Sequence, residues 1–487
     1  MILDNGVIRT LDPRLPSSRA LPIAGDRCAG GVGVHETALA SPERVDLGGR
    51  CVLPGFTDAH VHFPAWALAR TQLRLEDAGS LADTLERVRA AAAAVSPGGW
   101  LRGRGWREAD WADGGSPTKE ALDTAAGDVP VALEARDGHT LWVSSAGLAR
   151  AGVPESDGIL REWDAWDFRE RHLHPSDDEY AAALRAALKV AASRGVTAVH
   201  DKDGAYAVPL WQRLRREEAL TLRVWQSLPA DRLDALEELD LHAGLGDDLL
   251  RIGYLKVFMD GTLGSRTAHL LDGSGMALTT QEELEEIVRR AAALGFPVAV
   301  HAIGDAANRA ALDAFEATKE VWHGRLRPRI EHAQLLAPED VPRFAELGVA
   351  ASVQFSHALA DGDVARREWA GRIEGAYAYR SLLESGALLV NGSDAPIEDL
   401  DPLAGIRAGV EHWREDQRLG IAEAIAATTV NPAWLTGEER RRGKLLPGYL
   451  ADLVVLDGDP FEADLADVEV VATMVGGRWV HNPPPWD

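Results

Sequence analysis

The stretch TQEELEEIVRRAAALGFPVAVH, residues 280–301, contains one complete unit of helix, glycine and strand. Thr280 followed three residues later by Glu283 forms a capping box, which predicts the start of a helix. Gly295 predicts the end of this helix, because glycine readily adopts the left-handed conformation that closes many helices. The apolar run 297–301 then predicts a strand that is buried on both faces, as in parallel sheets.

The same order of helix, glycine and apolar strand recurs on both sides of this stretch. A capping box at 176–179 predicts a helix that ends at Gly195, and a strand follows at 196–200. We count eight such strands along the chain, at 53–60, 196–201, 221–227, 252–259, 297–301, 328–334, 349–354 and 387–394. Eight parallel strands with helices between them predict an α/β fold, the (β/α)8 TIM barrel.

One connection in this pattern is too long for an ordinary strand-to-helix unit. Between His62 and Ser176 the sequence contains a helical pattern near 81–95 and a strand-like run at 129–136. Barrel enzymes carry their active sites at the C-terminal ends of the strands, where this connection begins. We therefore predict that residues 64–175 form an insertion that covers the active site, within a barrel domain of residues 54–440.

The two ends of the chain resemble each other and differ from the middle. Short strand-like runs bounded by Gly, Pro and Asp lie near both ends, at 2–10, 46–53, 451–456 and 470–475. Gly476 and Gly477 separate two of these runs and predict a hairpin. Neither end has enough strands to bury a sheet face alone. We therefore predict that 1–53 and 441–487 together form one composite β-sandwich domain.

The composition excludes several classes of function. The chain has 487 residues, with 51 Lys and Arg against 76 Asp and Glu, so its net charge is −25. Such an acidic surface repels nucleic acids and anionic membranes. Cys28 and Cys51 are the only cysteines, too few for a disulfide framework. No signal-peptide pattern or membrane-length apolar run is present, so we expect a soluble, cytoplasmic protein.

Polar residues that can bind a metal follow the apolar strands at the point where each strand ends. They are His60, His62, His301, His332 and Asp394, with Lys256 at the end of the fourth strand. His60 and His62 lie two residues apart, so they face the same side of their strand. Imidazole nitrogens and carboxylate oxygens bind Zn²⁺ and similar divalent ions. One such residue is usually a core or turn residue, but five at four strand ends of one barrel predict a metal site.

Lys256 has two interpretations. An ammonium group beside two metal cations is electrostatically unfavourable. Carboxylation by CO₂ would convert the lysine into an anion whose two oxygens can bridge two metals. Alternatively, an unmodified lysine could pair with Asp260 or with an acidic substrate. Charge alone leaves both interpretations open.

Two motifs resemble the amidohydrolase superfamily. Leu-Pro-Gly-Phe-Thr-Asp-Ala-His-Val-His at 53–62 is similar to its opening strand, and Asn-Gly-Ser-Asp-Ala-Pro at 391–396 is similar to its closing strand. Further motifs resemble the YtcJ-like branch of that superfamily, which includes N-substituted formamide deformylases. They lie at 103–111, 136–148, 256–268, 300–305 and 329–334. The resemblance extends over nearly the whole chain.

This resemblance implies a metal-dependent hydrolase with a barrel and a composite β-sandwich. It implies a set of metal ligands: His60, His62, Lys256 as a carbamate, His301, His332 and Asp394. We expect two divalent ions as cofactors, zinc in the first place, with manganese or cobalt as alternatives.

The chemistry that fits is hydrolysis of an amide-like C–N bond, in an N-substituted formamide or another N-acyl amine. Two divalent ions can generate a metal-bound hydroxide near neutral pH and polarise the substrate carbonyl. We expect Asp394 to take the proton of this hydroxide and pass it to the leaving nitrogen. We expect substrate contacts from His139, Trp106 and Arg266, although packing within the insertion is an alternative role for Trp106.

Two other functions compete with this one. A mononuclear, deaminase-like hydrolase of the same superfamily relies on His-x-x-Glu after the fifth strand, but Ala-Ile-Gly-Asp follows His301. A non-catalytic scaffold on the same fold typically loses metal ligands, and none is lost here. We expect a small-molecule substrate, no nucleic-acid or membrane partner, and a homodimer as the candidate assembly.

Overall fold

The chain folds into two compact units in the computed structural model. One unit contains Met1–Trp66 and Leu184–Asp487, and the other contains Ala67–Ala183. The structure describes residues 1–33, 41, 43–96, 98–135, 140–153, 155–161, 163–173, 175–264 and 266–486. The predicted domain limits, 1–53 with 441–487, 54–440 and 64–175, stay predictions.

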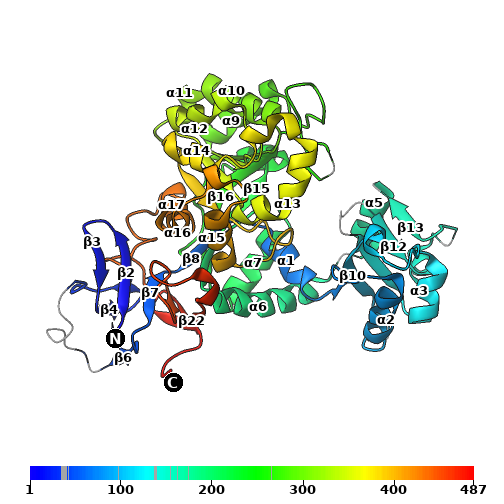
Figure 1. Cartoon of the computed structure of the whole chain (residues 1–487), viewed down its shortest axis with the longest axis horizontal. Helices are drawn as coiled ribbons and strands as arrows, with labels where there is room; N and C mark the ends of the chain where they lie inside the picture. Colours follow the sequence, from blue (N-terminus) through cyan, green and yellow to red (C-terminus); the bar gives the residue numbers. More distant parts are fainter. Residues whose placement is uncertain are drawn as a thin grey trace. The chain divides into compact units, whose positions relative to one another are not determined.

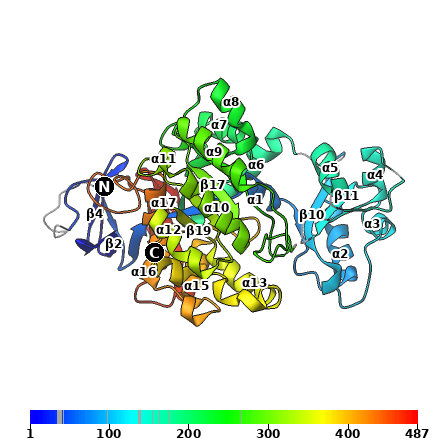
Figure 2. The ribbon, with the colours of Figure 1, turned by 90° about the horizontal axis from the view of Figure 1, so that it is seen from above.

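Eight strands of the first unit form one parallel sheet in the order of the chain (Figures 1 and 2). They are β8 (Phe56–Val61), β14 (Val196–Asp201), β15 (Arg223–Pro229), β16 (Leu250–Phe258), β17 (Val298–Ala302), β18 (Arg329–His332), β19 (Ala350–Val353) and β20 (Leu389–Asn391). The segment that follows β20 is hydrogen-bonded to the C-terminal end of β8. Asp394 N donates to His60 O (2.7 Å), and His62 N donates to Ala395 O (2.9 Å). The predicted (β/α)8 barrel is confirmed.

Helices alternate with the barrel strands, as the sequence predicts. They are α6 (Asp177–Ser193), α7 (Ala207–Arg216), α8 (Leu233–Glu238), α9 (Gln281–Ala293), α10 (Asp305–Ala317), α11 (Lys319–Trp322), α12 (Val341–Leu347), α13 (Phe355–Glu368), α14 (Tyr379–Glu384), α15 (Pro402–Glu411), α16 (Ile421–Ala427) and α17 (Val430–Leu435). Helix α9 begins with the predicted capping box of Thr280 and Glu283. Gly295, just after it, has a φ of 74°, a conformation that glycine tolerates best.

The two ends of the chain form a common β-structure, and Figure 1 shows both termini there. A six-stranded sheet has the order β23 (Arg478–His481), β22 (Val470–Val475), β21 (Leu453–Leu456), β7 (Cys51–Pro54), β2 (Val7–Asp12), β3 (Leu15–Ser18). A four-stranded sheet has the order β5 (Arg27–Cys28), β4 (Leu21–Ala24), β1 (Ile2–Asp4), β6 (Arg44–Asp46). Both sheets contribute to one apolar core, which includes Leu3, Leu21, Leu453 and Met474. The predicted composite sandwich is confirmed.

The second unit contains a mixed sheet with helices. Its strands have the order β13 (Ile159–Arg161), β12 (Thr140–Val143), β11 (Val131–Ala135), β10 (Leu101–Trp106), β9 (Leu73–Arg74). The chain enters this unit in α1 (Phe63–Ala69), and its own helices are α2 (Leu81–Ala92), α3 (Lys119–Ala126), α4 (Ser145–Ala151) and α5 (Trp163–His172). No helix of the described part of the chain is long and apolar enough to cross a membrane.

Candidate metal centre

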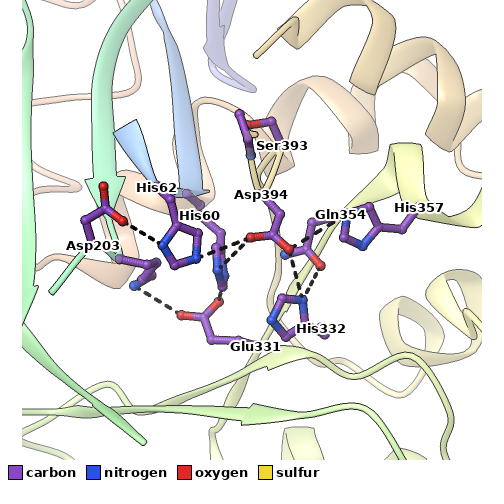
Figure 3. A network of polar contacts seen from close by, with 12 residues as sticks. His60, His62, Asp203, Glu331, His332, Gln354, His357, Ser393 and Asp394 are labelled. Atoms are coloured by element: carbon purple, nitrogen blue, oxygen red, sulfur yellow. Dashed lines mark hydrogen bonds and ion pairs between the residues drawn. The ribbon is translucent and has the colours of Figure 1, made fainter. Parts of the chain in front are cut away.

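Three of the predicted ligands lie in one buried cluster at the C-terminal ends of the strands. Nitrogen atoms of His60 and His332 and an oxygen of Asp394 lie within 4.8 Å of one another. The Nε2 atom of His60 is 3.3 Å from Asp394 Oδ1, and Nε2 of His62 is 3.6 Å from the same oxygen (Figure 3). Strands β8, β18 and the segment after β20 therefore bring these residues together from distant parts of the chain.

Two further predicted ligands, His301 and Lys256, border this cluster. The ring of His301, on β17, has its centre 4.5 Å from that of His332. Burial, and then the charge of Lys256, lower the pKa of His301 to about 3. Lys256 itself is buried on β16, 4.9 Å from the centre of the Phe258 ring, and its Nζ has no hydrogen-bond partner among the described residues. Burial lowers the pKa of this lysine, which favours its neutral amine form.

Hydrogen bonds orient His60 and His62, the two histidines at the end of the first barrel strand. Nδ1 of His60 donates to Glu331 Oε2 (2.8 Å), and Nδ1 of His62 donates to Asp203 Oδ1 (3.0 Å). Carboxylate oxygens can only accept here, so the hydrogen of each neutral ring lies on Nδ1 and leaves Nε2 bare. A bare ring nitrogen is what a metal ion binds.

His332 and His301 follow the same rule with different partners. Nδ1 of His332 donates to the amide oxygen of Gln354 at 2.8 Å, which leaves its Nε2 bare. His301 is turned the other way, because its Nε2 donates to the backbone oxygen of Gly261 at 3.0 Å and leaves Nδ1 bare. Each of the four predicted histidine ligands thus keeps one nitrogen free of hydrogen for a metal.

Glu331, the partner of His60, is part of a fully buried ionic network. Its Oε1 atom is 3.1 Å from Lys202 Nζ and 2.9 Å from Arg329 Nε, and all three side chains have no solvent exposure. Burial alone would raise the pKa of Glu331, but the charge of Arg329, together with the hydrogen bond from His60, outweighs it and holds this pKa well below its usual value. Glu331 therefore remains ionised and accepts the hydrogen of His60.

Asp394 and Asp58 connect the last barrel strand to the first. Burial would raise the pKa of Asp394, but the neighbouring histidines, His60 foremost, hold it well below its usual value. Asp58 Oδ1 accepts hydrogen bonds from the backbone N–H groups of His60 and Ser393, both at 3.1 Å. Burial raises the pKa of Asp58 to about 7. The backbone of both ligand segments is thereby held in place.

The donor set fits a divalent metal ion. Nε2 of His60 and Nζ of Lys256 are buried and have no hydrogen-bond partner in the described ranges. Buried polar atoms in folded proteins normally have a partner, and imidazoles with a carboxylate are common ligands of zinc. His60, His62, His301, His332 and Asp394 would hold the metal.

Comparisons with known proteins agree with this geometry. The sequence model of the amidohydrolase family matches residues 43–481. The chain belongs to the amidohydrolase family. It is 31% identical to the amidohydrolase-family protein YtcJ of Bacillus subtilis (strain 168), over 90% of each chain. It is 26% identical to an N-substituted formamide deformylase of Arthrobacter pascens, over 98% of this chain and 97% of the relative. The resemblance stated from the motifs is confirmed.

A solved structure gives the same result for this amidohydrolase. A metal-dependent hydrolase from Pyrococcus horikoshii superimposes with a TM-score of 0.84 and is 28% identical, over 96% of this chain and 99% of the other. With the buried cluster of two histidines and one aspartate, the chain is a metal-dependent hydrolase of the amidohydrolase superfamily.

Of the predicted substrate contacts, the structure describes Trp106 and Arg266, and neither is one of the three residues of the cluster. Trp106 is 5% exposed in the core of the second unit, where its indole N–H donates to Leu133 O at 2.9 Å. Its ring lies 5.9 Å from Trp111 and 5.7 Å from Trp142, the packing role that the sequence offered as an alternative. Arg266 is 70% exposed and pairs with Glu368 at 2.9 Å, and His139 lies outside the described residues. The substrate contacts stay predictions.

Several residues of the site escaped the sequence analysis. They are Asp203, Glu331, Gln354, Lys202, Arg329 and His357. Two of them, Arg329 and Glu331, could have been found from the sequence. They are two charged residues on one face of a strand that is otherwise expected to be buried and apolar.

Proposed function

We propose that this amidohydrolase hydrolyses amide-like C–N bonds, with N-substituted formamides or other N-acyl amines as its substrate class. The observation that carries the proposal is the orientation of the four ligand histidines. Each of them has one nitrogen hydrogen-bonded to the protein and the other free of hydrogen. Asp394 lies among them, 3.3 Å from His60. Metal-activated water beside an ionised carboxylate suits the hydrolysis of a small acylated amine.

The proposed metals are two divalent ions, with zinc first and manganese or cobalt as alternatives. Such ions supply an activated water near neutral pH and polarise a carbonyl group. Asp394 is ionised and can accept the proton of the attacking water. It then returns that proton to the nitrogen as the C–N bond breaks, so that a carboxylic acid and an amine leave the site.

Lys256 is proposed to carry a carbamate between the two metals. Its buried Nζ has no hydrogen-bond partner in the part of the chain that the structure describes. The neutral amine attacks CO₂, a new N–C bond forms, and one proton leaves to solvent. The product is an anion with two oxygens. Its formation replaces the positive ammonium group of Lys256, which two nearby metal cations would repel.

A mononuclear hydrolase is the second candidate. The three ligand atoms of His60, His332 and Asp394 that lie within 4.8 Å of one another can hold a single ion. The name of the Arthrobacter relative, at 26% identity, favours a formamide substrate over the ring-bound amino group that a deaminase removes.

The test uses the whole purified chain, stripped of metal and reloaded with zinc, manganese or cobalt. Bound metal is measured by elemental analysis, and a panel of N-formyl amines, N-acyl amines, aminoacyl amides and cyclic amides is screened for released amine. We expect two equivalents of metal and turnover of at least one acylated amine. Turnover in fully demetallated protein, or release of ammonia from an amino group on a ring with one bound metal, contradicts the proposal.

A further inference from the structure

A fifth histidine, His357, reaches the same site from a different direction. It lies in the first turn of α13, directly after barrel strand β19, and is 5% exposed. Its ring is parallel to that of His332 within 4°, with the centres 6.4 Å apart. Its Nε2 atom is 3.9 Å from Asp394 Oδ2, and Figure 3 shows it beside Gln354. His357 therefore faces the group proposed to move the proton.

The hydrogen-bond partner of His357 gives its ring the opposite state to the four ligand histidines. Nε2 of Gln334 donates to His357 Nδ1 at 3.2 Å. An amide NH₂ group can only donate, so Nδ1 is the acceptor and the hydrogen of the neutral ring lies on Nε2. The nitrogen that faces the site therefore carries a hydrogen, which makes it a donor and not a metal ligand.

This donor has no acceptor within the described residues. Nε2 of His357 is buried and unpartnered, and 3.9 Å to Asp394 is too long for a hydrogen bond. The amide nitrogen of Gln354, three residues earlier, is a second buried donor without a partner. Buried donors left unpaired cost about 1–3 kcal/mol each. Two of them at the same junction of β19 and α13 indicate that an acceptor occupies this corner when the site is in use.

We infer that His357 donates its Nε2 hydrogen to the acyl oxygen of the substrate. The inference rests on the proposed hydrolysis. As the water oxygen bonds to the carbonyl carbon, an electron pair of the C=O bond moves onto the acyl oxygen, which becomes negative. The N–H of His357 stabilises that charge without giving up its proton, and the pair returns to re-form C=O as the C–N bond breaks. Gln354 supplies a second N–H to the same oxygen.

The test compares His357→Phe with His412→Phe in the zinc-loaded full chain. His412 is a matched control, because it is also a buried histidine of the barrel unit, with its Nδ1 bonded to Arg414 N at 2.9 Å and its Nε2 unpartnered among the described residues. With 4-nitroformanilide as probe, we expect kcat to fall by ~10²-fold in His357→Phe. KM changes little, since the hydrogen bond strengthens in the transition state. The control keeps the wild-type kcat.

Two further measurements separate a donor role from a structural one. His357→Gln places an amide N–H near the position of Nε2, so it should recover part of the lost kcat. Zinc affinity, measured by competition with a chromogenic chelator, should be unchanged in both variants. Loss of zinc in His357→Phe, or a kcat within twofold of wild type, overturns the inference.

A binding experiment decides the inference even if no amide is hydrolysed. Methylphosphonate presents tetrahedral oxygens of the kind that His357 would contact, and its binding to the zinc-loaded protein is measured by calorimetry. Loss of one charged hydrogen bond should raise its dissociation constant about tenfold or more in His357→Phe. Equal affinities, or no binding by either protein, overturn the inference. Absence of amide turnover with this difference intact overturns only the proposed function.

Discussion

Replacing Glu331 with Gln removes a negative charge that lies between two buried cations. The carboxylate is 3.1 Å from Lys202 Nζ and 2.9 Å from Arg329 Nε, with all three side chains fully buried. Removing one partner of a buried ion pair costs ~3–5 kcal/mol, because the remaining charge stays uncompensated. We expect the free energy of unfolding to fall by about that amount in Glu331→Gln.

The same substitution also weakens the hydrogen bond that orients His60, a predicted metal ligand. Glu331 accepts the Nδ1 hydrogen of His60 at 2.8 Å, and losing such a partner typically costs 10–100-fold in metal affinity. A tenfold loss corresponds to about 1.4 kcal/mol. Because the amide oxygen of Gln can still accept the hydrogen, we expect a loss near tenfold. Urea unfolding measures the stability, and chelator competition measures the zinc affinity.

A second variant separates the two effects. Lys202→Met removes one cation without touching the hydrogen bond between Glu331 and His60. We expect the double variant, Lys202→Met with Glu331→Gln, to regain part of the stability lost in Glu331→Gln but none of the lost zinc affinity. Wild-type zinc affinity in Glu331→Gln would refute the idea that Glu331 positions His60 for the metal. Recovery of affinity in the double variant would show that net charge, and not the hydrogen bond, sets it.

Three more predictions follow from the structure. Asp394→Asn should keep the fold and most of the metal but lose ~10²–10⁴-fold in kcat, and a near-wild-type kcat in steady-state assays would show that Asp394 is only structural. Lys256→Ala should lose metal and activity, part of which a short-chain carboxylic acid in the buffer restores; full metal content by elemental analysis would contradict the carbamate. Deleting 449–487 removes β21, which pairs with β7 from Leu453↔Pro54 to Leu456↔Cys51, so we expect insoluble protein. Soluble, active truncated enzyme in a sedimentation assay would count against the composite sandwich.

The features predicted correctly from the sequence are those that local chemistry determines. The capping box of Thr280 and Glu283 acts over three residues, and it begins α9 as predicted. The glycines Gly476 and Gly477, with φ of 53° and 73°, form the predicted hairpin between β22 and β23. Because both signals depend on adjacent residues, no knowledge of the tertiary structure was needed to read them.

The cluster of ligands was predictable for a different reason. Once eight apolar runs indicate a barrel, the barrel itself places the strand ends together. His60, His332 and Asp394 are then neighbours, although the chain separates them widely. The role of Trp106 was not predictable in this way, since its neighbours depend on how the inserted sheet packs, and an aromatic residue serves a core and a pocket equally well.

The residues that the sequence did not reveal are those that orient the ligands. Glu331 lies 271 positions from His60, Asp203 lies 141 from His62, and no local pattern connects either pair. The register of the sheet brings them together, because β17 and β18 pair His301 with Glu331 and Ala302 with His332. Along β18, Glu331 therefore faces His60 while the next residue, His332, contributes to the metal cluster itself. One short strand thus supplies both a ligand and the group that orients another ligand, so any shift of its register would disturb two ligands at once. For this reason the buried charges of Lys202 and Arg329 belong to the function of the site as much as to the stability of the fold.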